Sequence, residues 1–309
     1  MDIKPKWLVN VPVATLWTSF DSAREIDRAA ITNPAFVEKW LSGLSHETSL
    51  ALCKNNLVQS QLLYGEEVIC LEEKDEWVKV IALNQSSSKD SKGYPGWLPK
   101  AQLMLVKDWL LNRGPIAVIK EKQASLYRDA KAARLSLSYQ TILPFICKNG
   151  GRIQVQIPSG EGFLQAEEVI IFESLENMYQ GSGKEIVSAG EKFLGLPYLW
   201  GGMSSFGYDC SGFSYSMCKA NGYIIPRDAH DQAASGKKID LEEILPGDLL
   251  FFAYEEGKGS IHHVGIYYGE GKLLHSPNIG KTIEIMEMKN TLYEKELCVA
   301  RRYWQEMEE

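Results

Sequence analysis

One cysteine stands in a setting that suits nucleophilic catalysis. Cys210 lies between Asp209 and Ser211, two residue types that favour a helix start, and the apolar spacing after it predicts a helix ending near Asn221-Gly222. Cys210 then lies in the first helical turn, where unpaired backbone N–H groups and the helix dipole stabilise a thiolate. The sequence therefore predicts a nucleophile, against the alternative of a small, inert, buried residue.

The base that this nucleophile needs is expected on a predicted hairpin. His263 stands at the start of one apolar strand, and His275 ends the next, after a turn at 268–272. Their even separation of twelve residues places both imidazoles on one face of adjacent strands. We therefore expect His263 to take the thiol proton and a neutral His275 to hold its ring tautomer.

Composition narrows the function classes. The chain has 309 residues, 45% hydrophobic and 24% charged, which suits a globular protein of two or three domains. Its net charge of −7 argues against partners such as nucleic acid or an anionic membrane. Six dispersed cysteines form no disulfide pattern, and no CxxC or HxxxH spacing indicates zinc, so we expect no metal and no cofactor.

Targeting and anchoring signals are not evident in the chain as given. The N-terminus carries no apolar core of signal-peptide length, and no run of about 18 apolar residues occurs. We expect a cytoplasmic protein, and a secreted protein whose leader has been removed is the alternative.

A weak internal repeat organises the N-terminal half. Gly96-Trp97-Leu98 and Gly162-Phe163-Leu164 follow alternating apolar runs at 77–80 and 153–156. Short strands joined by tight turns at this spacing predict two small β-barrels. Helical spacing over residues 21–52, with a helix start at Asn33-Pro34, predicts a helical insertion in the first barrel.

A Gly-rich linker at 180–183 separates this half from a different pattern. An amphipathic helix is predicted over 185–194, followed by an aromatic loop and the Cys210 helix. Strands are then predicted at 248–253, 264–268, 272–275, 283–286 and 299–303. Helices followed by an antiparallel meander predict an α+β domain.

A series of short motifs occurs in a fixed order between residues 180 and 305. They are Pro197-Tyr198-Leu199-Trp200-Gly201-Gly202, Asp209-Cys210-Ser211-Gly212-Phe213, Pro226-Arg227-Asp228, Gln232, Pro246-Gly247-Asp248-Leu249, His262-His263-Val264-Gly265-Ile266-Tyr267 and His275-Ser276. Together they closely resemble the NlpC-type family of cell-wall cysteine peptidases, and the two barrels resemble bacterial SH3-like domains. The resemblance implies two SH3-like β-barrels, at 1–110 and 111–178, followed by an α+β papain-like peptidase domain at 179–309.

The resemblance also implies catalytic roles, position by position. Cys210 is the expected nucleophile, His263 the general base and His275 the residue that orients it. Tyr198 is expected to polarise the scissile carbonyl together with the backbone N–H of Cys210. The implied reaction is hydrolysis of the amide bond between γ-D-glutamate and a diamino acid, with lysine and diaminopimelate both left open.

Substrate contacts are implied by one subgroup, the murein-peptide endopeptidases of the γ-D-glutamyl-L-diamino acid type, which the helical insertion resembles. There Asp228, with Glu66 and Tyr94 from the first barrel, is expected to bind a free L-alanine ammonium. The expected partner is therefore a short murein peptide. A solvated turn residue is the alternative for Glu66, and a strand-edge tyrosine for Tyr94. Ala229 replaces a serine of some relatives, which puts one substrate hydrogen bond in doubt.

Further residues are expected on the substrate side of the cleft, namely Asp209, Ser211, Trp200 and His262. Trp200 is equally a candidate for the core, and His262 for a cap on its loop. His230 and His46 are expected at the surface.

Other functions stay open at this point. A hydrolase of intact peptidoglycan stem peptides uses the same chemistry. A lipid acyltransferase or amidase uses the same cysteine and histidine, but an acyltransferase should carry an apolar anchoring segment. A non-catalytic wall-binding protein predicts a degraded triad, whereas Cys210, His263 and His275 are all present.

Overall fold

The computed structural model describes residues 4–128 and 135–305, and its contacts divide the chain into two compact units. The first unit holds most of residues 1–178 together with Ser204–Phe206, and the second holds Gln85–Ser91, Tyr179–Met203 and the chain from Gly207 onward. The boundaries of the three domains expected from the sequence stay a prediction. Within the described ranges, every helix is too short or too polar to span a bilayer.

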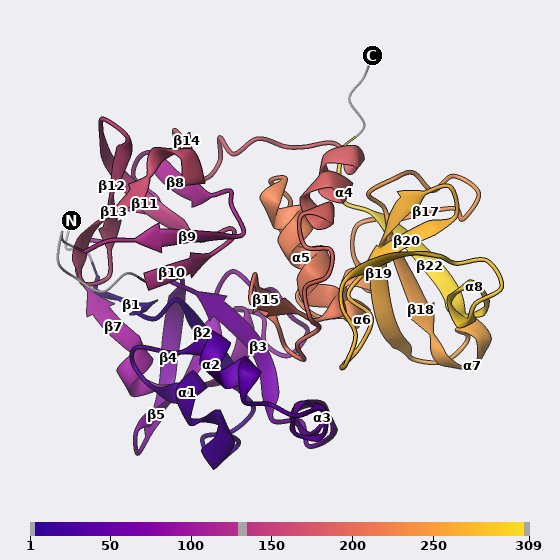
Figure 1. The fold of residues 1–309 in the computed structure, drawn as a ribbon, viewed down its shortest axis with the longest axis horizontal. Coiled ribbons are helices and arrows are strands. Elements are labelled where there is room, and N and C mark those ends of the chain that lie inside the picture. The colour runs from indigo at the N-terminus through magenta and orange to yellow at the C-terminus, as the bar shows by residue number, and fades with distance from the viewer. Residues whose placement is uncertain (1–3, 129–134, 306–309) are drawn as a thin grey trace. The chain divides into compact units, whose positions relative to one another are not determined.

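The N-terminal sheet of the first unit has the strand order β3-β2-β6-β5-β4-β1-β7 (Figure 1). Its strands are β1 (Lys6–Val9), β2 (Val13–Trp17), β3 (Val58–Leu63), β4 (Glu67–Lys74), β5 (Trp77–Ala82), β6 (Tyr94–Pro99) and β7 (Leu103–Val106), with the short helix η2 (Lys100–Gln102). Apolar side chains from alternating strand positions fill its core.

Helices lie between β2 and β3: η1 (Glu25–Asp27), α1 (Arg28–Ile31), α2 (Val37–Ser42) and α3 (His46–Lys54). The predicted helix start at Asn33-Pro34 is wrong, because α2 begins at Val37. The Asn33 side chain donates instead to the carbonyl of Ala101, and Thr32 Oγ1 donates to the carbonyl of Pro34. These bonds hold a turn where the sequence suggested a helix cap.

The second sheet of the first unit has the order β13-β12-β11-β8-β14, beside the hairpin of β9 and β10. The elements are β8 (Ile116–Ile119), β9 (Gln123–Leu126), β10 (Leu135–Ser138), β11 (Ile142–Asn149), β12 (Arg152–Ile157), β13 (Gly160–Gln165), η3 (Ala166–Glu168) and β14 (Val169–Phe172). Its core is a separate apolar cluster.

The internal repeat is confirmed by strand register. Val80 pairs with Gly96 across β5 and β6, and Val155 pairs with Gly162 across β12 and β13. A Cβ on Gly96 would lie 2.4 Å from Leu16 Cγ, and one on Gly162 would lie 2.8 Å from Leu126 Cδ1. Both positions therefore need glycine for the same reason, which is a leucine from a neighbouring antiparallel strand packed onto the backbone.

The second unit is built on one antiparallel sheet of order β17-β22-β18-β19-β20-β21. Its strands are β17 (Lys237–Ile239), β18 (Leu249–Ala253), β19 (Ile261–Gly269), β20 (Lys272–His275), β21 (Glu284–Glu287) and β22 (Leu297–Arg302). The five strands predicted for this domain are confirmed within a few residues, whereas β17 was missed. Residues Glu270 and Gly271 form the turn between β19 and β20 with positive φ, as the sequence predicted.

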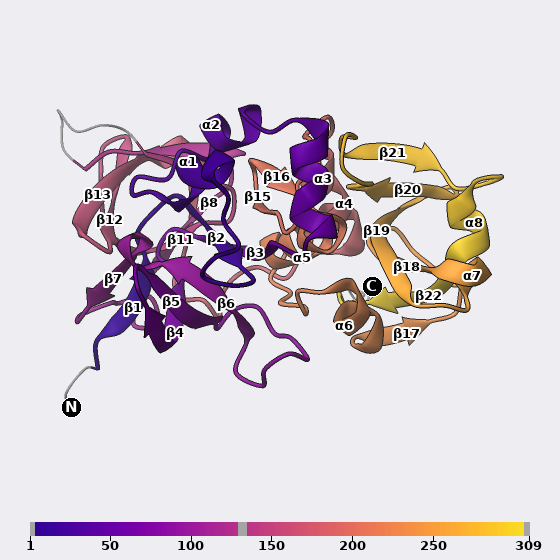
Figure 2. The ribbon, with the colours of Figure 1, turned by 90° about the horizontal axis from the view of Figure 1, so that it is seen from below.

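Helices α4 (Gly183–Glu191) and α5 (Cys210–Ala220) pack on each other and on β19 and β20, at one face of this sheet (Figure 1). The small hairpin of β15 (Met203–Ser204) and β16 (Gly207–Tyr208) precedes α5. Helices α6 (Ala229–Ala234), α7 (Tyr254–Gly257) and α8 (Leu292–Glu296) were not predicted, and α7 and α8 lie together (Figure 2). The predicted helix over 185–194 is shorter than expected, because α4 ends at Glu191.

Candidate active site

Cys210 is the first residue of α5, as the sequence predicted. The N-cap is Asp209, whose Oδ1 accepts a hydrogen bond of 2.6 Å from the backbone N–H of Gly212. The helix ends at its C-cap Asn221, also as predicted. The backbone N–H of Cys210 precedes the first intrahelical donor and is directed out of the helix start.

The cap residue takes part in a buried ion pair that the sequence reasoning missed. Arg227 Nη2 lies 2.6 Å from Asp209 Oδ2, and Arg227 Nη1 lies 2.8 Å from Ser211 Oγ. The backbone N–H of Gly201 donates to the same carboxylate at 3.0 Å. Arg227 stands in a motif quoted from the sequence, but only the fold shows that its side chain reaches Asp209.

These contacts bear on the substrate-binding roles expected for Asp209 and Ser211. Both side chains are buried, and the polar atoms of each already bind within the protein. The substrate roles stay a prediction, while the contacts assign both residues to holding the start of α5. Gln232 adds to this by donating to the carbonyls of Ser211 and Pro226.

The two histidines lie together on adjacent strands, as the hairpin argument predicted. His263 Nε2 and His275 Nδ1 are 2.8 Å apart, and both side chains are buried. Gly265 stands opposite His275, where an added Cβ would lie 3.0 Å from His275 Cβ and 2.7 Å from Leu273 Cδ1. The absence of a side chain at Gly265 thus provides the space for His275 to pack beside His263.

Strand β19, which carries His263, also contacts the helix that begins at Cys210. Helix α5 packs against β19, and the backbone N–H of Val264, the residue after His263, hydrogen-bonds the Cys210 sulfur. Because Nε2 of His263 binds His275, its Nδ1 is the nitrogen left to take the thiol proton. His275 then accepts at Nδ1 and carries its hydrogen at Nε2, which lies 3.8 Å from Glu284 Oε1.

Burial sets the resting protonation of the site. Burial and the Asp209 carboxylate raise the pKa of the Cys210 thiol to about 12, against the opposing effects of Val264 N–H, Arg227 and Ser211 N–H. Desolvation thus opposes the stabilisation of a thiolate that the sequence predicts for the helix start, and the role of Cys210 as the nucleophile stays a prediction. Burial and the two neighbouring histidines lower the pKa of His263 well below its ordinary value. Both shifts favour the neutral forms of the thiol and of the imidazole.

His275 makes the stability of the fold depend on pH. Burial and Lys281 lower its pKa from 6.5 to about 4. Between these values the unfolded chain binds a proton that the folded chain does not, so the free energy of unfolding falls as pH falls below about 6.5. At pH 5 we expect this residue alone to remove about 2 kcal/mol of the stability present at pH 7.

Urea unfolding at pH 7 and pH 5 measures this loss. His275→Gln should shrink the difference by about that amount, whereas His46→Gln, at an exposed histidine on α3, should leave it unchanged. An equal pH dependence in wild type and His275→Gln contradicts the assignment.

Helix α8 supplies an unpredicted wall over the histidines. The ring of Tyr293 lies 5.2 Å from that of His263 and 5.1 Å from that of His275, centroid to centroid. Burial, with a smaller contribution from the Cys210 thiol, raises the pKa of Tyr293 to about 12. No local pattern marks a tyrosine thirty residues beyond His263 as its neighbour.

His262, on strand β19, has a hydrogen-bonding partner on helix α8. Its Nε2 lies 2.9 Å from Glu296 Oε2, and its ring stacks on Tyr254 with centroids 4.2 Å apart. These contacts favour the loop-holding alternative over a pocket role for His262. The substrate-binding role stays a prediction.

Tyr198 and Trp200 lie on the loop that leads into the β15–β16 hairpin. Tyr198 forms a parallel bridge with Tyr208, two residues before Cys210, and Leu199 N–H donates to the Tyr208 carbonyl. Both Tyr198 and Trp200 are half-buried. The placement beside the start of α5 is compatible with the oxyanion role expected for Tyr198, which stays a prediction.

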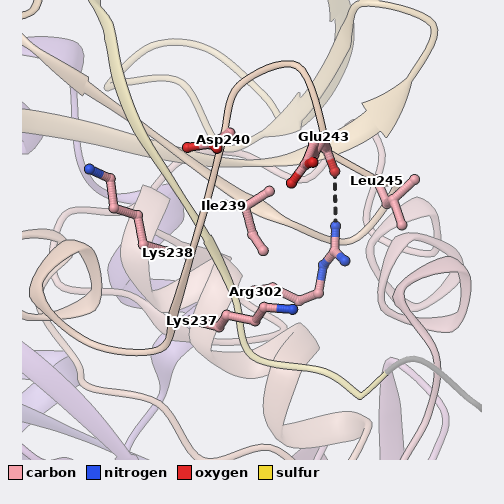
Figure 3. Close-up of a pocket in the computed structure, with 7 residues that line it drawn as sticks. All are labelled: Lys237, Lys238, Ile239, Asp240, Glu243, Leu245 and Arg302. Carbon is pink, nitrogen blue, oxygen red and sulfur yellow. Dashed lines mark hydrogen bonds between the residues drawn. The ribbon is translucent and has the colours of Figure 1, made fainter.

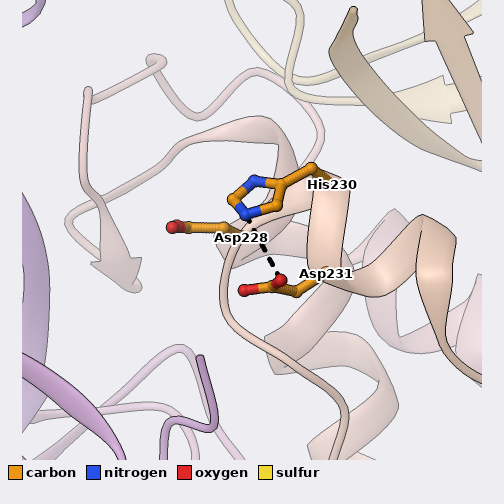
Figure 4. Close-up of side chains that lie close together, drawn as sticks. All are labelled: Asp228, His230 and Asp231. Carbon is orange, nitrogen blue, oxygen red and sulfur yellow. Dashed lines mark ion pairs between the residues drawn. The ribbon is translucent and has the colours of Figure 1, made fainter. Parts of the chain in front are cut away.

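Asp228 lies at the start of α6, close to two other ionisable groups. Figure 4 shows Asp228, His230 and Asp231 converging, with ligand-type atoms of all three within 4.8 Å of one another. His230 is exposed, as predicted, and its Nε2 lies 3.2 Å from Ser88 Oγ. Asp228 also forms an ion pair with Lys89, whose Nζ lies 3.2 Å from Oδ2.

Glu66 and Tyr94 belong to the first unit. Glu66 Oε2 accepts from the backbone N–H of Leu63 at 3.1 Å and so closes its own turn. Tyr94 begins β6, is buried, and donates to Gln59 Oε1 at 3.4 Å. Their expected contacts with a substrate amine stay a prediction.

A cavity of about 390 Å³ lies at the far edge of the sheet, around β17 and the end of β22 (Figure 3). Lys237, Lys238, Ile239, Asp240, Glu243, Leu245 and Arg302 line it. Arg302 is held by Asp248, with both nitrogen–oxygen distances at 2.7 Å. The cavity contains none of the residues assigned to catalysis.

Similarity to known proteins covers most of the chain. A model of the NlpC/P60 family matches residues 195–302, and one described as the YKFC SH3b2 domain matches residues 119–172. A γ-D-glutamyl-L-lysine dipeptidyl-peptidase of Bacillus subtilis (strain 168) is 46% identical over 95% of this chain and 97% of its own. One of the same name from Bacillus cereus (strain ATCC 10987 / NRS 248) is 36% identical over 96% of this chain and 91% of its own.

A solved structure agrees with the sequence comparisons. The crystal structure of an NlpC/P60 family protein from Bacillus cereus ATCC 10987 superposes with a TM-score of 0.94. It is 36% identical in sequence and covers 97% of this chain and all of its own. The fold expected from the sequence, SH3-like barrels with a papain-like peptidase domain, is therefore confirmed.

Proposed function

Because the chain belongs to the NlpC/P60 family and is a cysteine peptidase, we propose that it is a γ-D-glutamyl-L-diamino acid endopeptidase of short murein peptides. It releases L-Ala-γ-D-Glu from peptides that begin with a free L-alanine. The similarity to two γ-D-glutamyl-L-lysine dipeptidyl-peptidases spans nearly the whole chain, which supports this substrate class over the wider range of the family.

One observation carries the chemistry, which is the 2.8 Å contact between His263 and His275 beside the cysteine at the start of α5. A neutral imidazole with one nitrogen held by a hydrogen bond presents the other as a base of fixed orientation. The half-buried thiol becomes a nucleophile only when it can pass its proton to that base.

Acylation follows from these positions. Cys210 Sγ attacks the γ-D-glutamyl carbonyl carbon while its proton passes to Nδ1 of His263. The carbonyl oxygen takes up the negative charge, and the backbone N–H of Cys210 and the Tyr198 hydroxyl stabilise it, a contribution of about 3 kcal/mol for one donor. The C–N bond then breaks, and His263 returns the proton to the departing α-amine of the diamino acid.

Deacylation repeats these steps with water. His263 takes a proton from a water molecule as the water oxygen attacks the thioester carbon. The C–S bond breaks, Cys210 recovers its proton, and the acid product L-Ala-γ-D-Glu leaves. His275 keeps the imidazole in one orientation through both halves, since each imidazolium intermediate donates from Nε2 to His275 Nδ1.

The requirement for a free amine rests on Asp228. A carboxylate at the start of a short helix binds an ammonium by a charge-assisted hydrogen bond of about 1.5–3 kcal/mol. In intact wall the L-alanine nitrogen is an amide and carries no charge. The proposal therefore assigns the enzyme to recycling of released wall peptides, and the cytoplasmic location expected from the sequence stays a prediction.

The direct assay uses L-Ala-γ-D-Glu-L-Lys and its meso-diaminopimelate counterpart, with dipeptide release followed by mass spectrometry. We expect release from at least one, and a ratio of kcat/KM that decides between lysine and diaminopimelate. Acetylation of the L-alanine amine should lower kcat/KM by about 10- to 150-fold, because the ammonium contact is lost.

Unchanged turnover of the acetylated peptide contradicts the amine requirement. Release of peptides from purified sacculi at a rate comparable to the free tripeptide supports the alternative, a hydrolase of intact peptidoglycan. Absence of release from every substrate sinks the peptidase proposal.

A further inference from the structure

The segment Gln85–Ser91 (the 85–91 loop) is part of the second unit, although it connects β5 and β6. The backbone N–H of Arg227 donates to the carbonyl of Ser86 at 3.0 Å, and Ser88 N–H donates to Asp231 Oδ2 at 3.0 Å. Ser88 Oγ also lies 3.2 Å from His230 Nε2. The loop backbone is thus attached to the chain on both sides of Asp228.

Lys89 follows directly on this attached backbone and extends its side chain to Asp228. Its Nζ lies 3.2 Å from Asp228 Oδ2, with 38% of the lysine side chain and 19% of the aspartate side chain exposed. An alkylammonium at a carboxylate is the same chemical contact that the free amine of an L-alanyl peptide would make.

We infer that Lys89 is a specificity-determining residue whose ammonium occupies the amine-binding carboxylate Asp228 until a substrate ammonium replaces it. The inference rests on the proposed function, because it takes Asp228 as the group that binds the peptide amine. An incoming charged amine exchanges one ion pair for another. A peptide with a neutral N-terminus breaks the Lys89–Asp228 ion pair and supplies no charge in return. Lys89 therefore increases the difference in affinity between peptides with a charged N-terminus and peptides with a neutral one.

The exchange requires little rearrangement. Ser86 and Ser88 hold the backbone, so only the flexible four-carbon stem of Lys89 has to swing away, and its exposure gives it water to enter. A partly exposed ion pair of this kind is weak, worth up to about fivefold in an equilibrium constant. Lys89 therefore tunes affinity without blocking the site.

The test compares steady-state kinetics of the full-length protein and three variants with L-Ala-γ-D-Glu-L-Lys. Lys89→Gln should lower KM about two- to fivefold at unchanged kcat, because the competitor is gone. Lys89→Arg, which keeps the charge, should retain the wild-type KM. Lys92→Gln removes a like charge three residues on and serves as the matched control.

A double-mutant comparison locates the effect. In an Asp228→Asn background, Lys89→Gln should leave KM unchanged, because the two residues act through one contact. An unchanged KM for Lys89→Gln in the native background overturns the inference. A raised KM also overturns it, and assigns Lys89 to binding the substrate or holding the loop.

The outcomes separate this inference from the proposed function. If wild type releases dipeptide and Lys89→Gln behaves like wild type, only the inference fails. If wild type releases nothing, the proposed function fails, and calorimetric titration with L-alaninamide still decides on Lys89: tighter binding to Lys89→Gln supports the exchange, and equal or weaker binding refutes it.

Discussion

Replacement of Cys210 by alanine is expected to lower kcat/KM for the tripeptide by at least about 10⁴-fold. The thiol forms the bond to the carbonyl carbon, and the described site holds no second nucleophile at the start of α5. Removing one member of a triad leaves only the binding and oxyanion contributions. Dipeptide release by purified protein, with active-site titration by a thiol reagent, measures the loss.

Cys218→Ala is the matched control. Cys218 lies on the same helix, is fully buried, and also has a thiol pKa raised to about 12 by burial. Its truncation removes one small buried side chain and should cost about 1 kcal/mol of stability without changing kcat. Full activity of Cys210→Ala, or a loss in Cys218→Ala as large as in Cys210→Ala, contradicts the assignment.

Replacement of Arg227 by methionine should have the next largest effect. The change leaves the Asp209 carboxylate buried without its cation, which costs about 3–5 kcal/mol of unfolding free energy. It also removes the donor to Ser211 and a positive charge that opposes the rise in the Cys210 pKa. We expect kcat of the folded protein to fall at least about tenfold.

A second buried arginine–aspartate ion pair in the same unit provides the control. Arg302 forms a buried ion pair with Asp248, both distances being 2.7 Å, beside the cavity shown in Figure 3. Arg302→Met should lose a similar 3–5 kcal/mol, about the cost of any broken buried pair, while kcat of the folded protein stays within about twofold. Urea unfolding and kcat, both measured at low temperature, separate the two effects.

Equal kcat values in Arg227→Met and Arg302→Met would mean that Arg227 serves stability alone. Arg227→Met combined with Asp209→Asn adds a further check. The neutral amide removes the stranded charge, so part of the lost stability should return, whereas the activity should not.

Much of the site was predictable because its parts are local. The helix start at Cys210 follows from Asp209 as a cap and from apolar spacing, and both were confirmed. The meeting of His263 and His275 follows from strand alternation and a two-residue turn. The repeated Gly-aromatic-Leu pattern predicted two barrels for the same reason, since turn and pleat chemistry act over a few residues.

What the sequence could not determine depends on contacts between distant positions. The local argument considers only the helix start, which favours a thiolate at Cys210, whereas desolvation, which only the packed fold creates, raises the pKa of the thiol. The Arg227–Asp209 pair joins residues 18 positions apart, and the Lys89–Asp228 pair joins residues 139 positions apart. The contact of Tyr293 with His263 likewise brings together a helix and a strand that are distant in the sequence.

The sequence by itself thus determined the helix start at Cys210 and the hairpin of the two histidines, and so which atoms we propose for the chemistry, because each of these elements is defined within about a dozen neighbouring residues. Only the tertiary structure decided how those atoms are tuned. Burial and ion pairing depend on which distant side chains share a volume, and this is set by packing of the whole unit rather than by spacing along the chain.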